Sequence, residues 1–133
     1  MSARFEALGI VVSDLDASLA FYRKLGLEFP DDPEVEGHIE AVLPGGTRLM
    51  LDTEEVMTSF DPDFEAPTGA GRISLAFGCD DPGAVDALHD ELVAAGHTSL
   101  RPPFDAFWGQ RYATVLDPDG NSVDLFAALA GQG

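Results

Sequence analysis

The sequence predicts an α+β fold of two tandem βαβββ modules, whose mixed sheets curve into a barrel-like form with the helices outside. Two observations lead to this prediction. The two halves of the 133-residue chain carry the same order of strand, helix and turn signals. Each half also begins with an apolar strand that ends at an acidic helix cap, Asp14 in the first and Asp81 in the second. We expect a single domain over residues 1–133, with one module at about 4–52, a linker at about 53–70 and a second module at about 71–128.

The first module is expected to open with a strand at 5–12, followed by a helix. Apolar residues recur at helical spacing from Leu15 to Leu25, and Gly26 is typical of a helix end because glycine readily adopts positive φ. A short strand at 27–29 should follow. Strands at 38–43 and 47–52, joined at Pro44-Gly45-Gly46, then form a hairpin.

The second module repeats this pattern with a strand at 72–79, a helix that ends at Gly96 and a short strand at 97–100. Strands at 112–116 and 121–126 form its hairpin around an Asp-Pro-Asp-Gly turn. Prolines and glycines at 53–70 indicate an irregular linker between the modules. Residues 131–133 are expected to be disordered.

Composition excludes several classes of partner. The net charge of −17, from 24 acidic against 7 basic residues, would repel a nucleic-acid backbone. No apolar segment approaches the roughly 20 residues that a membrane span requires. Cys79 is the only cysteine, so no disulfide within the chain and no cysteine zinc site is expected. These features together predict a cytoplasmic protein.

Two motifs resemble the vicinal oxygen chelate superfamily, which includes glyoxalases, bleomycin resistance proteins and dioxygenases. They are VSDLDASLAFYRKLG at 12–26 and DPDGNSVDLF at 117–126, and the resemblance spans nearly the whole chain. Within the superfamily, the chain is most similar to antibiotic resistance proteins of the mitomycin-binding type. The segments that carry this second similarity are MSAR at 1–4, EAVL at 40–43, APTG at 66–69 and WGQRYA at 108–113.

The resemblance implies where metal ligands would lie in a metal-dependent relative, namely on the first and last strands of each module. In this chain the four matching positions hold Ala7, Met50, Ser74 and Asp124. They offer one good oxygen ligand where a divalent cation needs at least three protein donors. We therefore expect no metal and no other cofactor. His89 and His97 fall outside these positions and are expected at the surface.

Strand alternation separates a helix-facing set from a cavity-facing set. In the first module Arg48, Met50 and Asp52 should face the cavity, and in the second Ser74 and Asp124 should do so. The second module's helix-facing residues are expected to be Ile73, Leu75, Phe77, Val123 and Leu125. The small residues on the first strands either leave room for a flat or bulky guest or allow close packing of the two sheets.

Residues 102–111 place three aromatic side chains and an arginine in one loop rich in proline and glycine. Judged by its chemistry alone, Trp108 serves core packing and ligand stacking equally well. The resemblance implies that Trp108 stacks on one face of a planar ligand and His38 covers the other. Phe60, in the linker, either covers the pocket or anchors that segment. The predicted ligand-binding residues are Trp108, His38, Phe107, Arg111, Met50, Glu40, Asp52, Ser74, Asp124 and Phe60.

These observations favour a metal-independent binding protein for a planar antibiotic or metabolite, which sequesters its ligand. No catalytic residue is predicted, because no nucleophile can be paired with a base by a recognisable motif. One alternative is a metal-free isomerase or lyase with Asp124 or Glu40 as general base and Arg48 or Arg111 stabilising an anion. Another is a binding module for an ordinary metabolite. The resemblance also implies a homodimer, in which modules pair across subunits.

Overall fold

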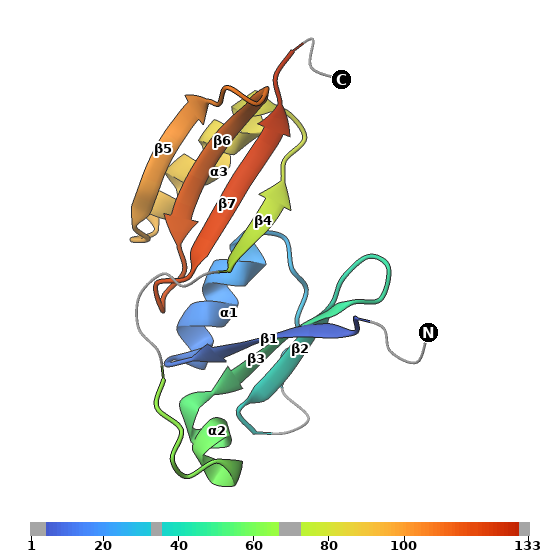
Figure 1. The fold of residues 1–133 in the computed structure, drawn as a ribbon, viewed down its shortest axis with the longest axis vertical. Helices are drawn as coiled ribbons and strands as arrows, with labels where there is room; N and C mark the ends of the chain where they lie inside the picture. The colour runs from blue at the N-terminus through green and yellow to red at the C-terminus, as the bar shows by residue number, and fades with distance from the viewer. Residues whose placement is uncertain (1–4, 33–35, 67–72, 131–133) are drawn as a thin grey trace. The chain divides into compact units, whose positions relative to one another are not determined.

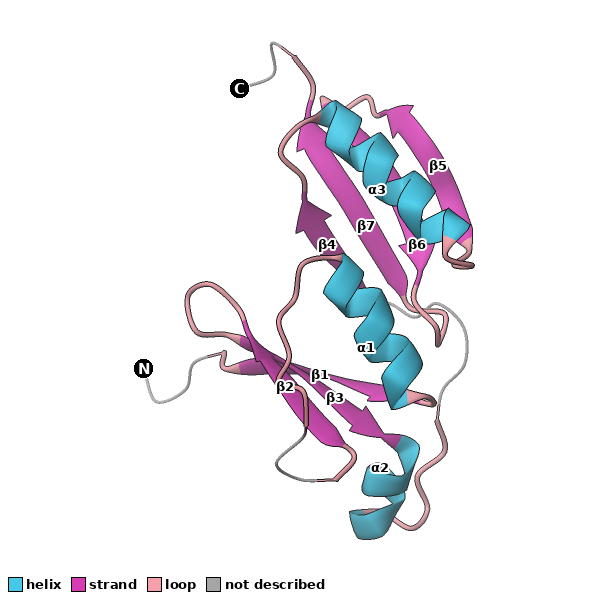
Figure 2. Cartoon of the chain, turned by 180° about the vertical axis from the view of Figure 1, so that it is seen from behind, coloured by secondary structure: helices cyan, strands magenta, loops and turns pink. Residues whose placement is uncertain are grey.

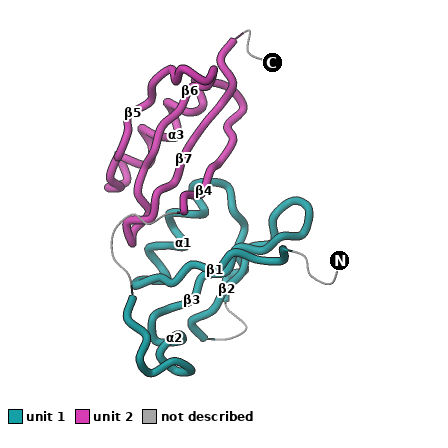
Figure 3. Tube along the Cα trace, viewed as in Figure 1, with its two compact units in different colours: residues 1–67 teal, residues 68–133 magenta. Residues whose placement is uncertain are grey.

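Two units make up the chain, residues 1–67 and residues 68–133 (Figure 3). The structure is a computed structural model, and it describes residues 5–32, 36–66 and 73–130. Each unit carries one mixed sheet with a helix packed on it, so the predicted α+β class is confirmed. The residues of the predicted tail, 131–133, lie outside the described part. Within the described residues, none of the helices is both long and apolar enough to span a membrane.

The first unit is a three-stranded sheet in the order β1-β3-β2, with β1 parallel and β2 antiparallel to β3 (Figure 1). Its elements are β1 (Ala7–Val12), α1 (Leu15–Lys24), β2 (His38–Val42), β3 (Arg48–Thr53) and α2 (Glu54–Phe60). As predicted, the Asp14 side chain caps α1 by accepting a hydrogen bond from the Ala17 N–H at 3.1 Å. Leu49 and Leu51 of β3 are buried, whereas Arg48 and Met50, which alternate with them, are partly exposed. This alternation fixes which face of β3 meets solvent.

The second unit is a four-stranded sheet in the order β4-β7-β6-β5, and α3 covers one of its faces (Figure 2). Its elements are β4 (Ser74–Gly78), α3 (Pro82–Ala94), β5 (Ser99–Asp105), β6 (Gln110–Leu116) and β7 (Ser122–Ala128). Val123 and Leu125 of β7 are fully buried together with Val85 and Leu92 of α3. The residues that alternate with them on β7 therefore lie on the face that α3 leaves open.

The predicted strand at 27–29 is wrong, since residues 27–30 form no regular structure. Phe29 is nevertheless buried, so the apolar signal there reflects one anchored side chain rather than strand pairing. The first module is consequently βαββ, with one strand fewer than predicted. Each sheet also keeps two edge strands, so neither sheet closes into a barrel.

The predicted irregular linker at 53–70 contains a helix. Thr53 caps α2 by accepting a hydrogen bond from the Val56 N–H at 3.2 Å, and Glu54 and Glu55 lie in the first turn, where acidic side chains favour the helix dipole. The prolines and glycines that predicted irregular structure all come after residue 60. The prediction therefore extends the irregular structure too far toward the N-terminus of the linker.

The short strand predicted at 97–100 is longer than expected, because β5 continues through Pro102 and Pro103 to Asp105. Proline is tolerated there because β5 is the edge of its sheet, and the pairing with β6 shifts register between Arg101 and Phe104. Residues 102–105 and 110–111 of the predicted aromatic loop are therefore strand. The remainder is a tight turn that ends at Gly109, where φ is +90°.

Two side chains differ in burial from the prediction. His89 was expected at the surface but lies on the buried side of α3, where the hydrogen bond between its Nε2 and Ser99 Oγ, at 2.7 Å, compensates the burial of the polar ring. Ile73 was expected to pack inward but is 69% exposed, because it precedes β4 at the edge of the sheet. The exposure of Ile73 is therefore decided by its place at the edge of the sheet and not by strand alternation alone.

Leu125→Ala should lower the free energy of unfolding by about 2 to 5 kcal/mol, because it leaves a cavity between β7 and α3. The matched control is Leu100→Ala on β5, where the leucine is 46% exposed and the cost should stay under about 1 kcal/mol. Urea denaturation of both variants measures the difference. Equal costs would show that the core of this unit does not lie under Leu125.

Candidate functional site

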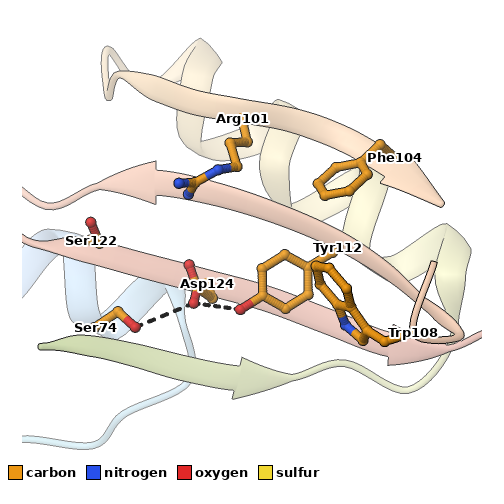
Figure 4. Close-up of a pocket in the computed structure, with 7 residues that line it drawn as sticks. All are labelled: Ser74, Arg101, Phe104, Trp108, Tyr112, Ser122 and Asp124. Atoms are coloured by element: carbon orange, nitrogen blue, oxygen red, sulfur yellow. Dashed lines mark hydrogen bonds between the residues drawn. The ribbon is translucent and has the colours of Figure 1, made fainter. Parts of the chain in front are cut away.

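A pocket of about 370 Å³ lies on the sheet of the second unit (Figure 4). This volume is within the range of roughly 300 to 1,000 Å³ that small-molecule sites occupy. All four strands contribute, because residues on the face opposite α3 lie side by side in register: Ser74 beside Ser122, and Thr114 beside both Asp124 and Arg101. The pocket is lined by Ser74, Arg101, Phe104, Trp108, Tyr112, Ser122 and Asp124.

The Asp124 carboxylate ties three strands together at the floor of the pocket. Its Oδ2 accepts hydrogen bonds from the Tyr112 hydroxyl at 2.5 Å and from the Ser74 hydroxyl at 3.4 Å, both drawn in Figure 4. Its Oδ1 accepts a hydrogen bond from the buried Thr114 hydroxyl at 2.8 Å. A carboxylate has about four acceptor positions, so protein donors occupy most of the capacity of Asp124.

Three aromatic rings form one wall of the pocket. The ring centre of Trp108 lies 5.2 Å from that of Tyr112 and 6.3 Å from that of Phe104, with interplanar angles of 81° and 89°. These edge-to-face contacts match the arrangement that aromatic quadrupoles prefer. The Trp108 indole N–H also donates to Gln110 Oε1 at 2.8 Å, which fixes the orientation of the ring. Although held in place, Trp108 remains 49% exposed.

Desolvation beside the pocket raises the pKa of Tyr112 to about 12, and its hydrogen bond to Asp124 adds to this shift. The phenol therefore keeps its proton at neutral pH and directs it to Asp124. Its oxygen lone pairs remain available as acceptors toward the pocket.

Arg101 enters the pocket from the edge strand β5, as Figure 4 shows. Its guanidinium donates to Thr114 Oγ1 at 3.1 Å, and the same hydroxyl donates to Asp124. The Thr114 hydroxyl thus connects the cation to the carboxylate without direct contact between them.

A second polar cluster lies on the sheet of the first unit. His38 Nδ1 contacts Asp52 Oδ1, His38 Nε2 lies 2.6 Å from Glu40 Oε2, and the Arg48 guanidinium donates to Glu40 Oε1 at 2.7 Å. The hydrogen bond to Asp52 raises the pKa of His38, and the hydrogen bond to Glu40 raises it further. The contact with His38 in turn lowers the pKa of Glu40. Two carboxylates therefore favour the charged imidazolium.

The structure brings the predicted ligand-binding residues together in two groups. Trp108, Ser74 and Asp124 line the pocket of the second unit. His38, Glu40 and Asp52 form the cluster of the first unit, and Met50 lies opposite Glu40 in the register of β2 and β3.

The other three predicted residues lie outside the lining of the pocket. Phe107, at the hairpin turn, is 96% exposed and contacts Trp108 edge-on at 5.0 Å. The Arg111 guanidinium pairs with Asp86 of α3 at 2.9 Å and with Asp105 at 3.0 Å, on the helix side of the sheet. Phe60 is the exposed last residue of α2.

Sequence reasoning did not single out Arg101, Phe104, Tyr112 or Ser122 as ligand-binding residues. Arg101 and Phe104 depend on the pairing of β5 with β6, which places Arg101 beside Thr114 and Phe104 beside Tyr112. The double proline at 102–103 concealed this strand. Alternation counted from Asp124 across the last hairpin would have found Tyr112.

The four positions at which the resemblance implies metal ligands do not suit a metal in this chain. Ala7 and Met50 offer no oxygen or nitrogen donor in the first unit. In the second unit, the Ser74 hydroxyl and the Asp124 carboxylate are hydrogen-bonded to each other. In the described part of the chain, no group of three or more His, Cys, Asp or Glu side chains has an arrangement that would hold a metal ion.

Comparison with known proteins identifies the family. A family model described as Glyoxalase/Bleomycin resistance protein/Dioxygenase superfamily matches residues 4–125. A solved member of that superfamily from Sphaerobacter thermophilus is 32% identical, with a TM-score of 0.65, and the match covers 94% of this chain and 97% of the other. No curated protein matches this chain.

Two further solved structures extend the comparison. A lactoylglutathione lyase from Agrobacterium tumefaciens is 25% identical, with a TM-score of 0.68, over 100% of this chain and 99% of that one. A hypothetical protein from S. aureus has a TM-score of 0.79 over 96% of this chain and 95% of its own, but at 20% identity it supports the fold alone.

The His38 cluster should make stability depend on pH. Because the pKa of His38 is raised above 6.5, the stabilisation that it provides is fully present below about pH 6.5 and is lost as the pH rises through the raised value. The urea midpoint of the wild type should therefore exceed that of His38→Gln most at acidic pH, and the gap should narrow toward alkaline pH. Asp52→Asn should weaken this pH dependence. Parallel pH profiles for wild type and His38→Gln would rule the prediction out.

Proposed function

We propose that this chain, which belongs to the Glyoxalase/Bleomycin resistance protein/Dioxygenase superfamily, binds a planar small molecule in the pocket of its second unit and sequesters it without a metal. The observation that carries the proposal is Trp108, a half-exposed indole held in a fixed orientation on the pocket wall. An indole face that is exposed to water and stacks on no other ring contributes little to the stability of a protein. A flat ligand would bury this surface and add stacking contacts.

The polar side of the pocket also supports binding rather than chemistry. A general base needs a lone pair that can reach a substrate proton, and Asp124 already accepts three hydrogen bonds from Ser74, Tyr112 and Thr114. Glu40, the other candidate base, is engaged by His38 and Arg48. Both carboxylates therefore act as fixed acceptors within the protein.

A metal-free isomerase or lyase is the second candidate function. The observation that favours it is the match to the lactoylglutathione lyase from Agrobacterium tumefaciens along the full chain. In that case Asp124 would have to release one of its three donors to accept a substrate proton. The two functions differ in the fate of the ligand, which an enzyme converts and a sequestering protein returns unchanged.

The similarity to mitomycin-binding resistance proteins suggests planar antibiotics as ligands, alongside ordinary planar metabolites. Our proposal rests on Trp108 and the aromatic wall. His38 belongs to the first unit, and its role as the second stacking face stays a prediction, as do the ligand contacts of Phe107, Arg111, Met50, Glu40, Asp52 and Phe60.

We also propose that the chain forms a homodimer through the edge strand β4. Within the described residues β4 pairs only with β7, which leaves its other edge without a backbone partner. At the opposite edge, Pro102 and Pro103 obstruct pairing along β5. Ile73, exposed directly before β4, adds apolar surface to the unprotected edge. A second copy of the chain is the occupant that fits, because equivalent edges can pair about a twofold axis.

Titration with planar compounds such as mitomycin should quench the fluorescence of the wild type, because Trp108 is the only tryptophan in the chain. Trp108→Ala, measured by calorimetry, should weaken binding by at least about tenfold, since it removes both stacking and apolar contact. The matched control is Val93→Ala, which should bind nearly as well as the wild type because Val93 is an exposed apolar residue of α3 that does not line the pocket.

Chromatography of the ligand after release decides between the two functions. Recovery of unchanged ligand supports sequestration, whereas time-dependent conversion supports the enzyme. Undiminished affinity in Trp108→Ala would contradict the proposed site.

The dimer is tested by sedimentation velocity of the wild type and of Ile73→Lys. The wild type should sediment as a dimer, and the variant should shift toward monomer because it places a charge at the edge of β4. Val42→Lys, at a similarly exposed apolar residue of β2, should leave the dimer unchanged. A monomeric wild type at sub-millimolar concentration would refute the proposal.

A further inference from the structure

We infer that the ligand of this pocket carries an anionic group, such as a carboxylate, which the Arg101 guanidinium binds at one end of the aromatic wall. This inference rests on the proposed binding function and specifies its ligand class. It identifies Arg101 as a specificity-determining residue.

The first observation is that Arg101 has no carboxylate partner among the residues that the structure describes. Its one hydrogen bond within the described part of the chain goes to the neutral hydroxyl of Thr114. By contrast, Arg48 pairs with Glu40 at 2.7 Å, and Arg111 pairs with Asp86 at 2.9 Å and with Asp105 at 3.0 Å. In a chain with 24 acidic and 7 basic residues, carboxylate partners are abundant. Since none of the carboxylates in the described part of the chain pairs directly with Arg101, the remaining N–H groups of this pocket cation are available to a ligand.

The second observation is that the Asp124 carboxylate, which also lines the pocket, accepts hydrogen bonds from other side chains. Asp124 Oδ2 accepts from Tyr112 and Ser74, and Oδ1 accepts from Thr114. The Thr114 hydroxyl donates its only proton to Asp124 and accepts from Arg101 with its lone pair. This relay holds the guanidinium in place and uses one N–H of the five that an arginine offers.

The remaining N–H groups suit a planar, two-oxygen anion. A guanidinium binds carboxylates through two parallel hydrogen bonds, and such charge-assisted bonds are stronger than neutral ones. An anionic ligand must also overcome the repulsion of a net charge of −17, so a cation inside the pocket favours its binding.

The position of Arg101 relative to the aromatic residues defines the shape of the ligand. Arg101 and Phe104 lie on the same strand, and both line the pocket together with Trp108 and Tyr112, as Figure 4 shows. A flat ring system can therefore rest against the aromatic wall while an anionic substituent on its edge reaches Arg101. The Ser74 and Ser122 hydroxyls remain for neutral polar groups.

Two probes that differ only in charge test the inference, namely 2-naphthoate and its neutral amide, 2-naphthamide. Calorimetric titration of the full chain at low salt should show that 2-naphthoate binds about tenfold more tightly than the amide. Arg101→Gln should abolish this preference while keeping its affinity for the amide, which also shows that the variant is folded. Arg101→Lys should retain part of the preference, because it keeps the charge and loses the two-point geometry.

Arg23→Gln is the matched control. It changes the net charge by the same amount as Arg101→Gln, but Arg23 lies at the end of α1 in the first unit and donates to the Pro30 carbonyl. The preference for 2-naphthoate should survive in this variant.

The outcomes separate the two proposals. Equal binding of both probes by the wild type would overturn the anion inference and leave the binding pocket standing. A preference that persists in Arg101→Gln would also overturn the inference. If neither probe binds and planar antibiotics do not quench Trp108, the proposed function and the inference fail together.

Discussion

The buried carboxylate of Asp124 is the interaction on which the candidate site depends. It lies at the centre of the open face of the four-stranded sheet and accepts hydrogen bonds from Ser74 of β4, Tyr112 of β6 and Thr114 of β6. A buried carboxylate is costly unless such donors surround it. The groups that donate hydrogen bonds to Asp124 also form the floor of the pocket and hold one ring of the aromatic wall in place. Removing the carboxylate would therefore release both the polar floor and the orientation of Tyr112.

The same position connects this chain to the chemistry of its superfamily. Its position on the last strand of the second module is one at which the resemblance implies a metal ligand in a metal-dependent relative, and here the aspartate accepts hydrogen bonds from protein hydroxyls. Ala7 and Met50, at the corresponding positions of the first module, carry no oxygen or nitrogen donor in their side chains. A pocket that organises hydroxyls and aromatic rings is suited to retaining a ligand by shape, stacking and charge. A Lewis acid is not required for that task.

Charge is distributed unevenly over a strongly acidic chain. Arg48 and Arg111 each neutralise carboxylates, and His38 joins Asp52 to Glu40 in the first unit. Within the described residues, Arg101 differs from these cations because it faces a pocket and has a neutral hydroxyl as its hydrogen-bond partner. The two units thus differ in the use of their polar side chains: the cluster on the first is internally paired, whereas the second keeps a cation and a half-exposed indole available. This contrast supports the second unit as the place where a ligand binds.

The sequence by itself determined the α+β class, the capped helices and the faces of the central strands, because these depend on local rules. Asp14 and Asp81 cap helices, Gly26 and Gly96 end them with positive φ, and alternation places Leu125 inward and Asp124 outward. Only the tertiary structure decided the pairing of β5 with β6, which brings Arg101 to Thr114, and the contact with α3 that takes Arg111 away from the pocket. The pairing of an edge strand that contains proline depends on residues distant in sequence. So do the contacts of a long, flexible arginine side chain. No local pattern records which partner such a side chain will find.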